Sequence, residues 1–459
     1  EVNSSFLKNR IFFDSPNKNI VPISTSIDKN GNLSIANCSI NNLVERYGSP
    51  IYLLDEMTLR SSCRAYKRAL EKYYPGKSLP IYASKANSSL FMSNLIHSEG
   101  LGLDAVSEGE LITALNGGVD NKKIVFHGNN KSDREIEFAM RNKIKIVVDN
   151  SFDLERLITF SESLNTTQEV MVRFTPGIEC HTHEYIKTGS VDSKFGFGIE
   201  NLEVVFSKIK KSKNVKLVGL HAHIGSQIFE LDPHNDLAEI MVKVALEAQK
   251  FGHIITELNL GGGLGVKYIP NDDPPTIDEW VETISKALIK ACEKNKFKLP
   301  TLMCEPGRSI VATSGVTIYK LGAFKEIPGL KTYISVDGGM SDNPRPITYQ
   351  SNYSACLVSD PLNLNSPKQF TIAGKHCESG VVLFKNILLG NCKTGDLLCV
   401  FGTGAYNLSM SSNYNRIPRP ASILLNDGNS ELIQKRETPE DLLRFDVLPD
   451  RFIKHSSVS

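Results

Sequence analysis

Polar side chains that could carry out chemistry follow short apolar runs along the first two thirds of the chain. Each stands at the carboxyl end of one run: Lys85, Asp104, His127, Asp149, Arg173, His223, the glycines Gly261, Gly262 and Gly263, and Glu305. One polar residue after one run marks only where a strand stops. Eight positions in register are not required by hydrophobic packing, and they predict a shared pocket.

Lys85 stands in the motif YASKAN (82–87). A lysine at the inner end of an apolar strand is costly to bury in its charged form. Its pKa can fall in such a site, which frees the amine to attack a carbonyl group. The alternative is an ordinary surface lysine that opens the next loop.

Glycine-rich motifs follow the last two runs, GGGLG (261–265) and EPGR (305–308). Glycine lets backbone N–H groups approach an anion closely, and Arg308 adds a fork of charged donors. Turns also use glycine, so the cluster alone is weak. A phosphate site paired with a reactive amine predicts pyridoxal 5'-phosphate, an aldehyde that carries a phosphate.

Glu305 and His223 gain roles beside such a cofactor. A carboxylate that faces the pyridine nitrogen keeps it protonated and makes the ring a strong electron sink. The alternative is a glutamate at a helix N-terminus. His223 would pack over the ring. Two His-x-His pairs (181–183 and 221–223) raise the possibility of zinc, but neither has acid or cysteine ligands at zinc-site spacing. We therefore expect no metal, and His221 as a satisfied core residue.

The elements that would position these residues alternate regularly. The apolar runs are 80–84, 102–107, 123–128, 145–150, 169–176, 217–226, 257–263 and 301–307, and helix-like segments such as 88–100, 108–118 and 272–295 lie between them. Eight buried strands alternating with helices over about 250 residues are typical of a (β/α)₈ barrel, whose last two loops commonly bind phosphate. A doubly wound open sheet is the alternative.

The rest of the chain has a β texture. Strand-like runs occupy 20–25 and 33–35, then 317–327, 331–339, 369–376, 381–389 and 396–406. We expect a barrel over residues 49–309 and a C-terminal β-sandwich or barrel domain over 310–450. The N-terminal strands of residues 1–48 should join that domain, and residues 451–459 should form a flexible tail.

Composition excludes several partners. The net charge of +1 gives no reason to expect nucleic acid or an anionic membrane. No apolar run approaches the ~20 residues that span a bilayer. The nine cysteines are scattered and form no CxxC pair, so a reducing cytoplasm is expected.

The motifs YASKAN, HIGSQ, LGGGLG, EPGR, DGGMSDNPRP, GKHCESG and GAYNLSMSSNYN, in that order, resemble the fold-type III pyridoxal-phosphate-dependent decarboxylases of basic amino acids. The resemblance covers residues 45 to 420. It implies a barrel with a β domain in an obligate head-to-tail homodimer, in which Cys377 and Glu378 reach the partner's site.

The resemblance also implies roles for matched residues. Lys85 would hold the cofactor aldehyde, His223 would stack on its ring, and Cys377 would donate a proton. The cofactor shell would be Lys85, Asp104, His223, Ser226, Gly261, Gly262, Gly263, Glu305, Pro306, Gly307, Arg308 and Tyr406.

Substrate choice is predicted from the DNPRP loop (342–346), which offers Arg345. Arg345 and Arg308 can grip carboxylates, and Glu378 can accept an ammonium group. Tyr349 and Tyr406 would complete the substrate contacts. The related ornithine enzymes have acids where Arg345 stands, so a distal carboxylate is expected. The alternative for Arg345 is a surface ion pair.

The expected reaction is the conversion of meso-2,6-diaminopimelate to L-lysine and CO₂, the last step of that route to lysine. The alternatives are a decarboxylase of ornithine, arginine or carboxynorspermidine, and remotely a non-catalytic regulatory homologue. Alanine racemases place an arginine where Glu305 stands. One departure is Val381, where the family has an acid. The stretch 180–198 resembles the family's mobile loop over the barrel mouth.

Overall fold

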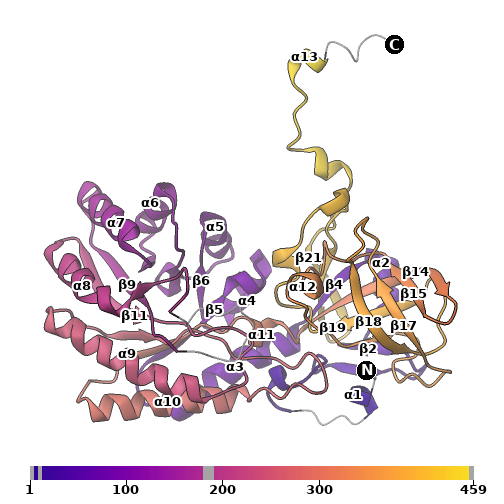
Figure 1. Cartoon of the computed structure of the whole chain (residues 1–459), viewed down its shortest axis with the longest axis horizontal. Helices are drawn as coiled ribbons and strands as arrows, with labels where there is room; N and C mark the ends of the chain where they lie inside the picture. The colour runs from indigo at the N-terminus through magenta and orange to yellow at the C-terminus, as the bar shows by residue number, and fades with distance from the viewer. Residues whose placement is uncertain (1–4, 9–12, 179–190, 454–459) are drawn as a thin grey trace.

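The computed structural model describes residues 5–8, 13–178 and 191–453. A β/α barrel and a β domain stand side by side, and the C-terminal segment extends away from the β domain (Figure 1). The chain begins near the β domain, enters the barrel, and returns to the β domain for its last third.

All eight predicted barrel strands are present. They are β5 (Ser78–Ala83), β6 (Gly102–Ala105), β7 (Ile124–Phe126), β8 (Lys145–Val148), β9 (Gln168–Thr175), β11 (Val215–His221), β12 (Glu257–Asn259) and β13 (Thr301–Cys304). Each pairs in parallel with the next, and β13 pairs with β5, so the ring is closed. Closure confirms the barrel over the open sheet. The short strand β10 (Phe197–Gly198) extends β9.

Alternation along the strands separates the inside of the ring from its outside. Ile81, Val125, Val147, Met171 and Met303 form their own buried cluster. Their strand neighbours belong to the larger cluster that includes the helices. Because successive side chains of a strand point to opposite faces, the small cluster fills the barrel interior.

Eight longer helices surround the ring: α3 (Glu56–Tyr73), α4 (Leu90–Ser98), α5 (Glu108–Asn116), α6 (Asp133–Arg141), α7 (Ser151–Leu164), α8 (Leu202–Lys211), α9 (Asp232–Lys250) and α10 (Ile277–Lys294). Side-chain caps fix where several begin. Thr276 and Glu279 form a capping box, so α10 begins at Ile277 rather than at the predicted residue 272.

The β domain is one large sheet with strand order β18-β17-β15-β14-β4-β20-β21, and β19 and β16 continue from β14. Its strands are β4 (Ile51–Asp55), β14 (Gly315–Ile327), β15 (Lys331–Val336), β16 (Ala355–Leu357), β17 (Lys368–Ala373), β18 (Val382–Leu389), β19 (Leu397–Phe401), β20 (Ala421–Asn426) and β21 (Asn429–Gln434). The placement of residues 51–55 in the barrel was wrong, because β4 pairs with β14 and β20.

The N-terminal strands form a separate sheet of β1 (Thr25–Ile27), β2 (Leu33–Ile35) and β3 (Cys38–Ser39), followed by α2 (Ile40–Tyr47). The sheet packs on the β domain through a shared apolar cluster, and the Leu33 amide donates to the Val358 carbonyl at 2.8 Å. The strand predicted at 20–25 starts only at Thr25, because a turn from Pro22 to Thr25 precedes it.

Four further α-helices have four residues each: α1 (Ser5–Lys8), α11 (Arg308–Val311), α12 (Arg345–Thr348) and α13 (Asp450–Ile453). α13 occupies the start of the segment expected to be a flexible tail, and residues 454–459 lie outside the described residues. Within the described chain, no helix combines the length and the apolarity needed to cross a membrane.

Candidate active site

A cavity of about 380 Å³ opens at the carboxyl ends of the barrel strands. That size suits a small-molecule ligand. The predicted residues that line it are Lys85, Asp104, His127, Arg173, His223, Ser226, Gly263, Glu305, Gly307, Arg308 and Tyr406, and His221, which was expected in the core, lines it as well. Lys85 and the glycine-rich turn therefore share one cavity, as the cofactor hypothesis requires. Gly262 and Pro306 adjoin lining residues in the chain but, like Gly261, do not line the cavity themselves.

Lys85 lies on a single 3₁₀ turn, Ser84–Ala86, directly after β5. The sequence predicts a buried lysine, but the side chain of Lys85 is exposed and lines the cavity. Its neighbours hold the turn in place, because the Ser84 hydroxyl donates to the Asp104 carbonyl at 2.6 Å and the Tyr406 amide donates to the Ala86 carbonyl at 2.8 Å. The β domain thus helps to position the lysine.

Glu305 lies at the end of β13 between two imidazole rings. His127 Nε2 lies 2.6 Å from its Oε2, and His221 Nε2 bonds its Oε1. Burial alone would raise the pKa of Glu305, but attraction and hydrogen bonds from both histidines hold that pKa well below its usual range. Burial lowers the pKa of His221 to about 4, despite Glu305. Glu305 is therefore ionised and accepts N–H bonds from both rings.

These three side chains correct the expectation about nearby acids. His127, His221 and Glu305 place one ligand atom each within 4.8 Å of one another, a spacing that could hold a metal ion. The acid comes from a distant strand, so local spacing could not reveal it. Here the Nε2 atom of each ring is already bonded to the carboxylate, and the buried Nδ1 of His221 has no partner among the described residues. The pair at 181–183 lies outside the described residues.

Asp104, at the end of β6, is a second buried carboxyl group beside Glu305. Burial, and then repulsion by Glu305, raise the pKa of Asp104 well above its usual range. Of the two neighbouring acids, Asp104 therefore carries the proton and Glu305 carries the charge. Environments that separate the pKa values of two acids in this way are common at catalytic sites.

His223 is half-buried and contacts the glycine-rich turn. The Gly262 amide donates to His223 Nδ1 at 3.1 Å. Burial, and then the positive charges of Lys85 and Arg173, lower the pKa of His223 well below its usual range. The ring is therefore neutral, with Nδ1 as an acceptor and its proton on Nε2.

The glycines at 261–263 serve close packing of neighbouring loops. A Cβ on Gly262 would lie 2.2 Å from the Glu305 carbonyl oxygen, and one on Gly263 would lie 2.6 Å from the Gly225 carbonyl oxygen. Gly263 also has φ 112°, which L side chains rarely adopt. Within this turn, only Gly263 lines the cavity.

Arg308 forms the cationic end of the cavity at the start of α11. Its guanidinium donates to Ser226 Oγ at 3.0 Å and to Tyr268 Oη at 2.6 Å, and it lies 4.7 Å from the Tyr406 ring centre. Its buried Nε has no hydrogen-bond partner among the described residues. Tyr406 has φ 59° and follows β19 after that strand has ended at Phe401, short of the predicted 406.

Arg345, on α12, is buried, so the alternative of a surface ion pair was wrong. Its guanidinium lies 5.8 Å from the ring centre of Tyr268, 5.4 Å from that of Tyr349 and 5.7 Å from that of Tyr406. It donates to Ser351 Oγ at 3.2 Å. No carboxylate of the described chain forms an ion pair with it. Arg345 does not line the cavity but shares Tyr406 with Arg308.

Cys377 and Glu378 lie on an exposed loop and do not line the cavity of their own chain. The Cys377 amide donates to Asn415 Oδ1 at 2.8 Å, and buried His376 lies 2.7 Å from Ser341 Oγ. Val381 ends this loop in an apolar, buried position, and one of its methyl groups occupies the space beside Gly374 where a Cβ would stand. The unusual valine therefore supports the loop by packing.

Several lining residues were missed in the sequence. They are Val106, Gly128, Asn129, Asn130, Lys131, Lys194, Phe195, Leu264 and Ser309. The polar run HGNNK (127–131), directly after a predicted strand, was a usable signal. The Arg173 guanidinium lies 4.6 Å from the Phe195 ring centre. Asp149 does not line the cavity, and its Oδ1 accepts from the Gly196 amide at 3.1 Å.

This donor set suits a phosphorylated aromatic aldehyde. An amine stands at one side of the cavity, an ionised carboxylate and a neutral imidazole stand near it, and Arg308 with Ser226 forms the anion end. The unpaired Nε of Arg308 is one buried donor that a bound anion could satisfy.

Comparisons with known proteins agree with this geometry. Residues 57–312 match the family described as pyridoxal-dependent decarboxylase, pyridoxal binding domain. A diaminopimelate decarboxylase of Synechocystis is 49% identical over 96% of this chain and 95% of its own, and one of Bacillus subtilis is 42% identical over 92% and 96%. The structure of the M. jannaschii enzyme with L-lysine has a TM-score of 0.87 and 32% identity, covering 94% of this chain and 99% of its own. The chain belongs to the diaminopimelate decarboxylase family of pyridoxal-phosphate-dependent carboxy-lyases.

Proposed function

We propose that the protein removes CO₂ from meso-2,6-diaminopimelate and releases L-lysine, with pyridoxal phosphate bound in the barrel mouth. The observation that carries the choice of substrate is Arg345, a buried guanidinium with no described carboxylate partner. A buried charge without an opposite charge beside it is costly, so a ligand carboxylate is its natural complement. The M. jannaschii relative was solved with L-lysine, the product of this reaction.

The residues of the site divide the work. Lys85 would hold the cofactor through its amine, and Arg308 with Ser226 and Gly263 would bind the phosphate. When bound, pyridoxal phosphate supplies an electron sink for the pair left by the departing carboxylate. Glu305 would face the ring nitrogen and keep a proton on it. His223, which the Gly262 amide holds in place, would pack on the ring.

Cys377 and Glu378 complete the site from a second copy of the chain. Both are exposed and lie outside the cavity of their own chain, which supports a homodimer in which each loop reaches the other site. Cys377 then returns a proton to the carbon that lost CO₂. Glu378 accepts hydrogen bonds from the distal ammonium group of the substrate, while Tyr349 and Tyr406 flank Arg345.

A reducing compartment such as the cytoplasm suits this chemistry. The eight cysteines of the described residues all carry free thiols, including exposed Cys377. Proteins of oxidising compartments commonly pair their cysteines.

The decisive experiment compares CO₂ release from meso-diaminopimelate, ornithine, arginine and carboxynorspermidine by purified protein with added pyridoxal phosphate. We expect turnover of meso-diaminopimelate far above that of the others. Faster turnover of ornithine or arginine would overturn the proposed substrate. Lys85→Ala should also lose the visible absorbance of bound cofactor.

A further inference from the structure

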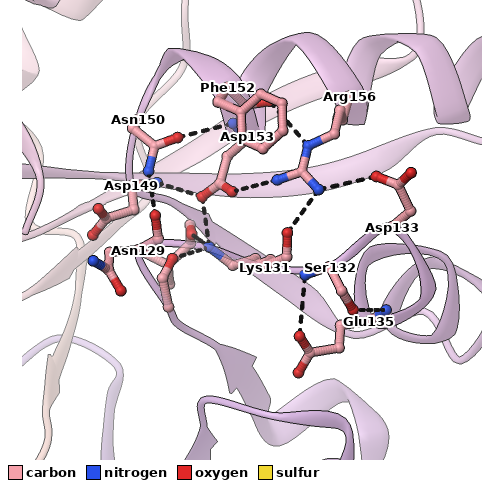
Figure 2. Close-up of polar contacts among 12 residues, drawn as sticks. Asn129, Lys131, Ser132, Asp133, Glu135, Asp149, Asn150, Phe152, Asp153 and Arg156 are labelled. Atoms are coloured by element: carbon pink, nitrogen blue, oxygen red, sulfur yellow. Dashed lines mark hydrogen bonds and ion pairs between the residues drawn. The ribbon is translucent and has the colours of Figure 1, made fainter.

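A buried ion pair between Lys131 and Asp153 lies beside the cavity and has no part in the mechanism above. Lys131 Nζ lies 2.8 Å from Asp153 Oδ2, and both side chains are fully buried. The lysine also donates to the carbonyls of Gly128 at 2.7 Å and Val147 at 2.8 Å. All three ammonium protons are therefore used (Figure 2).

The pair ties the loop after β7 to the start of α7. Asp153 Oδ2 also accepts from the Asp149 amide at 3.2 Å, at the end of β8. Arg156 donates to the Lys131 carbonyl at 2.6 Å and to Asp153 Oδ1 at 3.3 Å. Figure 2 shows these groups converging from α7 and the loop. Asn150 adds a bond from its Nδ2 to the Asn129 carbonyl at 2.7 Å.

Stability does not explain why charged residues stand here. Burial lowers the pKa of Lys131, although Asp153 opposes the shift. Burial therefore disfavours the charged form of this ammonium group. Replacing a buried ion pair by apolar residues of similar volume is often neutral or stabilising. The charged pair instead fixes the position of the loop, because the three hydrogen-bond acceptors of Lys131 define where the lysine and its loop must lie.

The loop held in this way carries His127. Gly128, whose carbonyl accepts from Lys131, follows His127 directly and has φ 133°, a conformation that L side chains rarely adopt. His127 Nε2 in turn donates to Glu305 Oε2 at 2.6 Å. A shift of the loop would therefore separate His127 from Glu305 and weaken the bond that keeps this carboxylate ionised.

We propose that Lys131 and Asp153 are positioning residues that hold His127 against Glu305. The inference rests on the proposed function in one respect, the placing of Glu305 at the cofactor ring. The hydrogen bond itself can be tested without cofactor.

The test compares two double variants. Lys131→Met with Asp153→Leu removes both charges and keeps the volume similar. Lys145→Met with Glu257→Leu is the matched control, because these side chains form an ion pair of 2.6 Å at the amino ends of β8 and β12, away from the cavity. In cofactor-free protein, the His127 ring N–H resonance, assigned with His127→Gln, reports the bond to Glu305.

We expect the first double variant to keep a melting temperature near that of the control but to lose or shift the His127 resonance. With cofactor, its kcat should fall about tenfold to a hundredfold, as misplacement by about 1 Å can cause, with KM little changed. The control should keep both the resonance and kcat. An unchanged resonance with unchanged kcat would overturn the proposal, as would an equal loss in the control.

Asp153→Asn, which keeps the shape of the side chain, serves if the double variant does not fold, and it should shift the same resonance. If wild type and control release no CO₂ from meso-diaminopimelate, the proposed function fails, while the resonance still decides whether the pair positions His127.

Discussion

At the scale of single residues, the charge of Glu305 depends on its neighbours. Two buried acids stand side by side, and the proton lies on Asp104 because His127 and His221 stabilise the ionised form of Glu305. A carboxylate beside the ring nitrogen would keep that nitrogen protonated, which is what makes the ring an electron sink. The difference between the acids can therefore be tested directly.

Glu305→Gln removes the charge and keeps the size of the side chain. We expect kcat for meso-diaminopimelate to fall about a hundredfold or more, in the range of lost electrostatic stabilisation at other active sites. Asp104→Asn is the comparison, because an amide resembles the protonated acid already present. The decrease in kcat for this variant should be much smaller. Steady-state rates at saturating substrate measure both, and equal losses would contradict the assigned protonation states.

Arg345→Met tests the proposed carboxylate site. Loss of a hydrogen bond to a charged group costs about 1.5–3 kcal/mol, so KM for meso-diaminopimelate should rise about tenfold to a hundredfold. Arg345→Lys keeps the charge but lacks the planar fork of the guanidinium group. Its KM should therefore lie between those of the wild type and of Arg345→Met. Initial rates over a range of substrate concentrations give the values. An unchanged KM in the methionine variant would place the distal carboxylate elsewhere.

The residues that the sequence revealed are those whose position in the chain marks a strand end. Lys85, Asp104, His223 and Glu305 all follow apolar runs, and the barrel brings them to one cavity. The Lys131–Asp153 pair could not be predicted, because its meaning lies in carbonyl groups of other segments. The contact of Glu305 with His127 and His221 was missed for the same reason, since the acid belongs to a distant strand.

At the scale of elements, strands were easier to predict than the sheets that contain them. The eight barrel strands are buried on both faces and therefore read as continuous apolar runs. β4 has the same character, five buried residues in succession, but its partners are β14 and β20 from the far end of the sequence. Burial identifies a strand and does not say which sheet it joins.

Helices α9 and α10 meet at a buried histidine that should make the fold sensitive to acid. His234 Nε2 accepts from the Trp280 indole at 3.2 Å, and burial lowers the pKa of His234 from 6.5 to about 4. Between pH 6.5 and about pH 4, His234 therefore binds a proton in the unfolded chain but not in the folded chain. The free energy of unfolding should fall by roughly 3 kcal/mol from this group as pH drops from 6.5 to 4.

His234→Gln should reduce that loss, because glutamine can still accept from the indole and does not titrate. Urea unfolding between pH 4 and 7 measures the difference, and exposed His97→Gln is the control that should follow wild type. Buried His221 adds a similar loss in both variants. Parallel pH profiles for wild type and His234→Gln would show that His234 does not titrate as described.

At the scale of the whole molecule, the two domains share one task. The barrel supplies Lys85, Glu305 and Arg308, while the loop after β19 brings Tyr406 to the same cavity. The β domain also carries Cys377, but on an exposed loop that does not line this cavity. The domain thus serves its own site with one loop and, in the proposed dimer, the partner's site with another.

Mixing two inactive variants tests that arrangement. Lys85→Ala and Cys377→Ala chains should each have little activity, because every site of either homodimer lacks one of the two groups. After the mixed chains are unfolded and refolded together, each hybrid dimer has one intact site, so about a quarter of wild-type activity should return at equal amounts. Mixing Lys85→Ala with a chain that carries both substitutions should restore none, since no hybrid site is then intact. If tagged chains prove that hybrids form and activity still does not return, Cys377 does not act across the interface.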